Sequence, residues 1–204
     1  AAEAQQVKDL YEETGKTVGA IKNCKKGDHV IRLGPESPAP AAQIVWEAKE
    51  DAGYDLKHAL AELDEARKNR QAQIGVFVFS KKTAPAVLQP FERYGSDLVI
   101  VWNAEDPATD LYIKAAYSVS RALALRMSSV SSERDEAMQG IEQATRAVER
   151  QLKRIDEIKT WAETVRGHGE KIAVSAGKIR EDIQDSVAHL DELVGALKSA
   201  APNS

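Results

Sequence analysis

The chain has a single cysteine, no long hydrophobic run and few aromatic side chains, and each scarcity excludes a class of protein. Cys24 has no partner for an internal disulfide and belongs to no Cys/His cluster. No apolar run approaches the roughly 20 residues that span a bilayer, so we expect no membrane segment. A net charge of -4 gives no overall positive field for nucleic acid, so such contacts must depend on local basic patches. The sequence therefore predicts a cytoplasmic protein without disulfides.

The composition changes along the chain, which predicts two parts. All seven prolines except Pro202, all three Phe and all five Tyr precede residue 131, and the remainder is charged and rich in alanine. With 204 residues, of which 43% are hydrophobic, the chain can form one core and an appendage. We therefore predict a globular α/β domain over 1–130 and a helical part over 131–204. Because the chain does not begin with Met, we also expect it to be a segment of a longer protein.

Hydrophobic periodicity predicts a mixed sheet flanked by helices in the first part. Helices are expected over 3–22, 55–70 and 106–127, and strands over 29–33, 42–49, 74–80 and 97–102. The continuous apolar runs at 74–80 and 97–102 are typical of strands covered on both faces. This order of elements predicts at least one parallel crossover.

The strand at 42–49 places polar side chains on one face. Successive strand residues alternate between faces, so Ile44 and Trp46 share one face while Val45, Glu47 and Lys49 share the other. Glu47 and Lys49 are therefore expected to lie side by side.

Two acidic residues and a lysine then point to phosphodiester chemistry. Asp28, at the start of one strand, and Glu47, near the end of the next, can supply carboxylates to Mg²⁺ or Mn²⁺, with the Ala48 carbonyl as a third ligand. Lys49 on the same face can orient or help to deprotonate an attacking water, and can offset charge that develops on a phosphate.

This pattern resembles the PD-(D/E)XK nuclease superfamily over roughly residues 3–102. The matching segments are Gly27-Asp28 and IVWEAK, followed by an amphipathic helix and a buried strand. The resemblance implies a restriction-endonuclease-like fold that cuts DNA with Mg²⁺, in which Asp28 and Glu47 match the acidic positions and Lys49 the lysine. The segment is also similar to a bacterial family in which such a core carries long coiled-coil helices. No clear strand precedes Asp28, so we expect the usual three-strand meander to be shortened or supplied differently.

Phosphate contacts are assigned to three basic clusters. They comprise Lys25 and Lys26, Arg67 and Arg70, and Lys81 and Lys82. Each cluster is equally compatible with a solvated rim.

Structural roles compete with each of these assignments. Asp28 also suits a turn after Gly27, because Asp bonds readily to local backbone. Glu47 and Lys49 also suit a solvated pair on a strand surface. Glu12 and Glu13 can add an acidic ligand, but exposed carboxylates of the helix expected at 3–22 are the favoured interpretation.

The second part predicts a coiled-coil hairpin. Apolar residues recur near a 3.5-residue period on both sides of Gly167-His168-Gly169, which is expected to break the helix. The seam comprises Ile141, Thr145, Val148, Leu152, Ile155 and Ala162, then Ile172, Ala176, Ile179, Ile183, Ser186 or Val187, Leu190, Leu193 and Leu197. Because such a stripe cannot form a core alone, a homo-oligomer is expected.

Together these features predict a Mg²⁺-dependent DNA nuclease, serving repair, restriction or phage defence, with a coiled-coil appendage. One alternative is a catalytically inactive nuclease-like module that binds DNA or a protein. Another is a structural coiled-coil protein whose globular head docks a partner.

Overall fold

The computed structural model describes the backbone of residues 2–128 and 135–199 and the side chains of residues 2–127 and 139–190. The predicted domain boundary at residue 130 lies outside these residues. Contacts divide the chain into a unit that spans Ala1–Ile155 and a second unit that spans Asp156–Ser204.

The first unit is built on a six-stranded mixed sheet in the order β1-β2-β3-β4-β6-β5. The strands are β1 (Leu10–Glu13), β2 (His29–Arg32), β3 (Gln43–Lys49), β4 (Ile74–Ser80), β5 (Phe91–Tyr94) and β6 (Asp97–Trp102). β1, β2 and β3 form an antiparallel meander, β3 and β6 each pair with β4 in parallel, and β5 pairs with β6 antiparallel. The predicted mixed sheet with a parallel crossover is confirmed.

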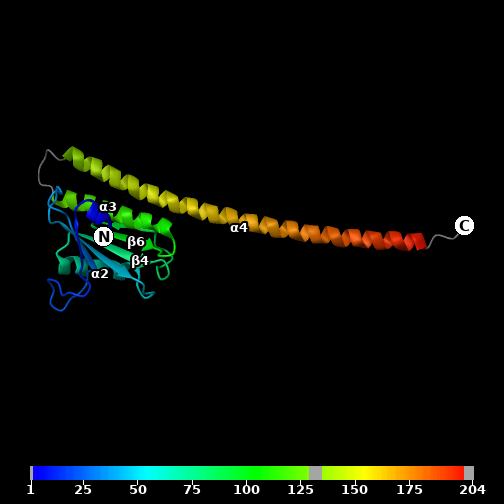
Figure 1. Ribbon diagram of the computed structural model, residues 1–204, viewed down its shortest axis with the longest axis horizontal. Helices are drawn as coiled ribbons and strands as arrows, with labels where there is room; N and C mark the ends of the chain where they lie inside the picture. The colour runs from blue at the N-terminus through cyan, green and yellow to red at the C-terminus, as the bar shows by residue number, and fades with distance from the viewer. Residues whose placement is uncertain (1, 129–134, 200–204) are drawn as a thin grey trace. The chain divides into compact units, whose positions relative to one another are not determined.

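Helices cover both faces of this sheet, as Figure 1 shows for α2 (Leu56–Arg70) and α3 (Asp110–Ser128). On the α2 face, Leu63 packs with Phe77 and Val99. On the α3 face, a larger cluster joins Val76 and Ile100 to buried residues of α3. Both covered faces explain why β4 and β6 are apolar at successive positions rather than at alternate ones.

The N-terminal region differs from the helix predicted over 3–22. Only α1 (Ala2–Gln6) is helical, Lys8 turns the chain at a φ of 59°, and the next residues form β1. The buried carboxylate of Asp9 accepts hydrogen bonds from Gly34 N and from the Tyr117 hydroxyl, which ties the turn to the core. Pairing with β2 thus overrides the helical period of this segment. β1 is the strand before Asp28 that the sequence did not predict.

The later helices are mostly as predicted, with one correction. A short 3-10 turn, η1 (Pro107–Thr109), precedes α3. The predicted hairpin is wrong, because α4 (Asp135–Ser199) continues as one helix through Gly167 and Gly169. A glycine inside a helix costs only about 1 kcal/mol relative to alanine, and the segment holds no proline to end it. Among the described residues, no helix is long and apolar enough to cross a membrane.

The start of α4 belongs to the first unit. Thr145 and Leu152 are buried there. Arg93 of β5 pairs with Glu149 at 2.7 Å and with Glu142 at 3.6 Å. Apolar burial and these ion pairs together fix this part of α4 to the domain.

Candidate active site

Strand register brings the predicted acidic residues together. His29 of β2 is the pairing partner of Trp46 of β3, so Asp28, directly before β2, lies beside Glu47 and Ala48. Glu47 Oε2 accepts hydrogen bonds from Gly27 N at 2.7 Å and from Asp28 N at 3.2 Å. In return, Asp28 Oδ2 accepts one from Ala48 N at 3.0 Å. These reciprocal bonds hold the two carboxylates at the same point of the sheet.

The predicted alternatives for these residues fit the structure poorly. Glu47 is only 2% exposed, so Glu47 and Lys49 do not form a solvated surface pair. The Asp28 side chain bonds to Ala48, twenty positions along the chain, rather than to its own turn. The hydrogen bonds of both carboxylates therefore connect the start of β2 to the end of β3.

Lys49 lies on the same face, between two acids. Its Nζ is 3.3 Å from Glu47 Oε1 and 3.1 Å from Glu62 Oε1. Glu62, on α2, is itself buried and accepts a hydrogen bond from the Tyr54 hydroxyl. The Lys49 ammonium also lies 5.7 Å from the centre of the Tyr54 ring, a cation-π distance. Lys49 is thus held in place by three side chains.

Burial and charge change the protonation of this cluster. Burial, followed by the negative charge of Asp28, raises the pKa of Glu47 to about 7. Burial acts in the opposite sense on Lys49, but the hydrogen bond to Glu62 and the charges of Glu47 and Glu62 raise its pKa above the usual value. Burial would also raise the pKa of Glu62, yet hydrogen bonds from Tyr54 and Lys49 lower it. Lys49 therefore stays an ammonium, and Glu47 is the group that resists ionisation.

The donor set suits a hard cation, although it is small. Within the described residues, no group of three or more His, Cys, Asp or Glu is placed to hold a metal ion. Mg²⁺ commonly takes only one or two carboxylates and completes its shell with water and substrate phosphate. The repulsion between Asp28 and Glu47 is the kind of charge imbalance that a cation relieves. Two carboxylates are therefore as many as Mg²⁺ commonly takes from a protein.

Gly27 and Arg70 shape the loop that carries Asp28. Gly27 has a φ of +94°, and a Cβ there would lie 2.6 Å from Arg70 Cγ and 2.8 Å from Val45 Cγ2. Arg70 is buried, and its guanidinium donates to the carbonyls of four loop residues at 2.7 to 2.9 Å: Thr14, Thr17, Lys25 and Lys26. Only glycine fits this crowded position with a positive φ.

The six basic residues assigned to phosphate contacts are not equivalent. Lys25 and Lys81 are exposed, and Lys82 is exposed but pairs with Glu105 at 2.9 Å. The other three have internal partners: Lys26 pairs with Glu65, Arg67 with Asp97, and Arg70 holds the loop. Arg70 is therefore an architectural residue, because its donors are directed into the protein.

Sequence reasoning missed Glu62 and the role of Tyr54. Glu62 lies between Ala59, Leu63 and Ala66 on the buried stripe of α2, where a carboxylate is unexpected unless it is paired. A carboxylate at an apolar position of the helix was the one sequence feature that could have identified Glu62. Glu13, considered as a helix carboxylate, is instead on β1 and lines an open pocket of about 390 Å³ with Asp28 and Lys16.

Comparison of the chain with protein-family models, curated proteins and solved structures finds no match. The functional argument therefore depends on the geometry of the site.

Proposed function

We propose that the protein is a Mg²⁺-dependent nuclease that hydrolyses DNA phosphodiester bonds. The observation that carries the proposal is the buried Glu47, bound reciprocally to the Asp28 segment and flanked by a fixed Lys49. Stability alone gives little reason to bury the Glu47 carboxylate beside a second carboxylate that repels it, and such clusters occur preferentially at functional sites.

The order of elements supports the same proposal. The resemblance to the PD-(D/E)XK superfamily requires a three-strand meander, then a helix and a further strand. β1, β2 and β3 form such a meander, and α2 connects it to β4 in parallel with β3. The acidic residues lie at the junction of the second and third strands of this unit.

In the proposed reaction, Asp28 and Glu47 would hold Mg²⁺, and the ion would supply positive charge to polarise the phosphate and to acidify the attacking water. The attacking water loses a proton to solvent and its oxygen forms a new bond to phosphorus. The ester bond to the sugar oxygen breaks, and that oxygen takes a proton from solvent. The Lys49 ammonium orients this water and offsets negative charge on the phosphate. Its raised pKa favours this electrostatic role over that of a base. Glu62 and Tyr54 act as positioning residues for Lys49.

Cleavage of linear single-stranded and duplex DNA with Mg²⁺ or Mn²⁺ tests this proposal. We expect cutting that EDTA abolishes and that Asp28→Asn and Lys49→Met each reduce at least 100-fold. Asp51→Asn is the matched control, because Asp51 follows β3 closely but, within the part of the chain that the structure describes, its carboxylate accepts a bond only from Gly53 N. Cutting that persists in EDTA, or that survives both site variants, contradicts the mechanism.

A binding module without hydrolysis is the second candidate. It is favoured by the small ligand set and by the ion pair that Lys49 makes with Glu47 Oε1. This candidate predicts DNA retention at low salt, no cleavage with either metal, and affinity that survives Glu47→Ala.

We further propose that the second unit associates with another copy of the chain. From Ile155 onward, a strict heptad places Ile158, Val165, Ile172 and Ile179 at successive d positions. The described a positions of this heptad are Ile155, Ala162, Gly169, Ala176, Ile183 and Leu190. Leu193 and Leu197 extend it beyond the described side chains.

The seam is exposed in the single chain, which gives association its driving force. Ile158 is 54% exposed and Val165 is 71% exposed. Four further residues of the strict heptad lie between these values: Ile172, Ile179, Ile183 and Leu190. Burying the remaining exposed surface of each of these side chains contributes about 1 kcal/mol. A symmetric pair therefore gains roughly 12 kcal/mol from six residues per chain, which is comparable to the cost of association.

Sedimentation velocity with paired variants tests the association. Ile179→Asp removes a seam residue, and Val174→Asp changes an equally exposed valine on the opposite side of the helix. We expect the wild type and Val174→Asp to be oligomeric and Ile179→Asp to shift to monomer. A monomeric wild type at tens of micromolar contradicts the proposal.

A further inference from the structure

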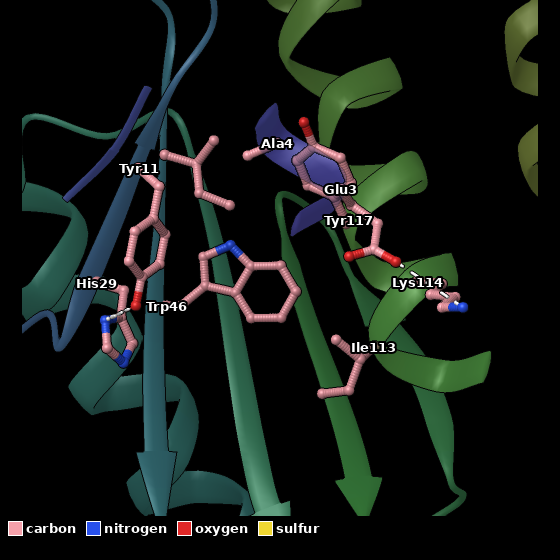
Figure 2. Close-up of a pocket in the computed structure, with 9 residues that line it drawn as sticks. Glu3, Ala4, Tyr11, His29, Trp46, Ile113, Lys114 and Tyr117 are labelled. Atoms are coloured by element: carbon pink, nitrogen blue, oxygen red, sulfur yellow. Dashed lines mark hydrogen bonds and ion pairs between the residues drawn. The ribbon is translucent and has the colours of Figure 1, made fainter. Parts of the chain in front are cut away.

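A second pocket lies on the sheet face opposite Glu47. It has a volume of about 220 Å³, and Trp46 lies at its centre, between Tyr11 and His29 on one side and α3 on the other (Figure 2). Trp46 and Glu47 are neighbours on β3, so their side chains leave the sheet in opposite directions. The pocket and the acidic cluster thus lie on opposite faces of the same segment of β3.

The walls of this pocket are aromatic and held in place. The Tyr11 and His29 rings stack with their centres 5.3 Å apart, and the Tyr11 hydroxyl lies 2.8 Å from His29 Nδ1. Across the pocket, the Tyr117 hydroxyl donates to the buried Asp9 carboxylate at 2.6 Å. A rigid aromatic site loses little side-chain entropy when a flat ring enters it.

The indole N–H of Trp46 is an unpaired hydrogen-bond donor among the described residues. Its Nε1 is buried and has no acceptor within the described residues. Buried donors normally have a partner, and an unpaired one calls for an explanation. A ligand acceptor would give this donor its bond if the indole turned toward the pocket. The ligand that suits the pocket is therefore a planar ring with a carbonyl or ring-nitrogen acceptor.

The Trp46 pocket shares one lining residue, His29, with the open pocket of about 390 Å³ that contains Asp28, Glu13 and Lys16. A ligand that reaches past His29 would place a flat ring against Trp46 and a phosphate toward Lys16 and Asp28. A nucleotide has this combination of parts, and its base presents ring-nitrogen and carbonyl acceptors.

We propose that the Trp46 pocket binds one unstacked nucleobase of the DNA strand whose phosphate lies at Asp28. This inference rests on the proposed function and narrows its substrate class to single-stranded or frayed DNA, because a base within a duplex is stacked and paired. Stacking on an aromatic side chain is worth about 1–3 kcal/mol per base.

Metal-free binding tests the pocket separately from hydrolysis. In EDTA, a short oligothymidylate is titrated while the indole N–H resonances of the three tryptophans, Trp46, Trp102 and Trp161, are followed by NMR. We expect the Trp46 resonance to shift and the other two to remain, with Trp46→Phe used for the assignment. A matched oligonucleotide in which every base is removed is expected to leave Trp46 unshifted.

Variants complete the test. Tyr11 lies on the exposed edge strand, so Tyr11→Ala tests the pocket without a core residue, and we expect at least tenfold weaker binding. Trp102→Phe is the control outside the pocket and is expected to bind as the wild type does. Equal binding of the base-free strand, or an unchanged affinity in Tyr11→Ala, overturns the pocket even if Mg²⁺-dependent cleavage is found. Base-dependent shifts at Trp46 without any cleavage uphold the pocket and reject the nuclease.

Discussion

Truncation of Arg70 is expected to destabilise the protein strongly. Arg70 is 8% exposed, and Arg70→Ala removes a donor from four loop carbonyls. Those of Thr17 and Lys25 then have no donor among the described residues, whereas Thr14 O keeps Thr17 N and Lys26 O keeps Asn69 Nδ2. Each unsatisfied buried acceptor costs about 1–3 kcal/mol, and water entering the gap recovers part of this. We therefore expect the free energy of unfolding to fall by about 3–5 kcal/mol, in the range found for broken buried charge networks.

Lysine is expected to replace Arg70 only in part. An ammonium keeps the charge but has three donors at one point, whereas the guanidinium reaches the loop from several directions. We expect Arg70→Lys to cost about 1–3 kcal/mol relative to the wild type. Lys68→Ala is the control, because Lys68 is exposed two positions earlier on the same helix and pairs only at the surface with Asp64. This control is expected to stay within about 0.5 kcal/mol of the wild type.

Urea denaturation followed by circular dichroism measures these differences. The same proteins are then titrated with DNA at low salt, where phosphate contacts are strongest. A loss of stability below 1 kcal/mol in Arg70→Ala, together with a clear loss of DNA affinity, would refute the architectural role and restore Arg70 as a phosphate contact.

Two further predictions concern buried carboxylates. Glu47→Gln keeps an oxygen acceptor for Gly27 N but removes the negative charge of a carboxyl group whose pKa is raised to about 7. In EDTA at pH 8 we therefore expect the variant to be more stable than the wild type by up to about 2 kcal/mol. We also expect it to cleave no DNA. A destabilised but active variant would disagree with this account. Burial raises the pKa of Asp97 to about 6, against the opposing charge of Arg67. The folded chain then holds a proton that the unfolded chain releases, so this group alone should lower stability by about 2 kcal/mol as pH rises from 4 to 6. In urea melts, Asp97→Asn should remove this contribution and leave the one of the same sign that Glu47 makes, and a slope that is unchanged in the variant would assign it to other groups.

Local patterns predicted the parts of the fold that depend on neighbouring residues in sequence. The alternation in β3 placed Trp46 and Glu47 on opposite faces, as observed, and the apolar runs marked β4 and β6. The predicted proximity of Asp28 to Ala48 also holds, because the proline-containing loop lets β2 and β3 pair directly.

Features that depend on distant contacts were not predictable in this way. β1 looked helical because its pairing with β2 and the burial of Asp9 are tertiary effects. The internal role of Arg70 could not be predicted without knowing where the loop carbonyls lie. Glycines at 167 and 169 suggested a break, but the absence of proline and the good helix formers around them keep α4 continuous.

Binding of Mn²⁺, followed by electron paramagnetic resonance, tests the central claim most directly. The proposal predicts one ion bound per wild-type chain without DNA, with binding lost in the double variant Asp28→Asn with Glu47→Gln and retained in Lys49→Met. Thermal melts establish that each variant is folded. A wild-type chain that binds no Mn²⁺ at millimolar concentration, or a double variant that binds it as the wild type does, would contradict the assignment of Asp28 and Glu47 as metal ligands.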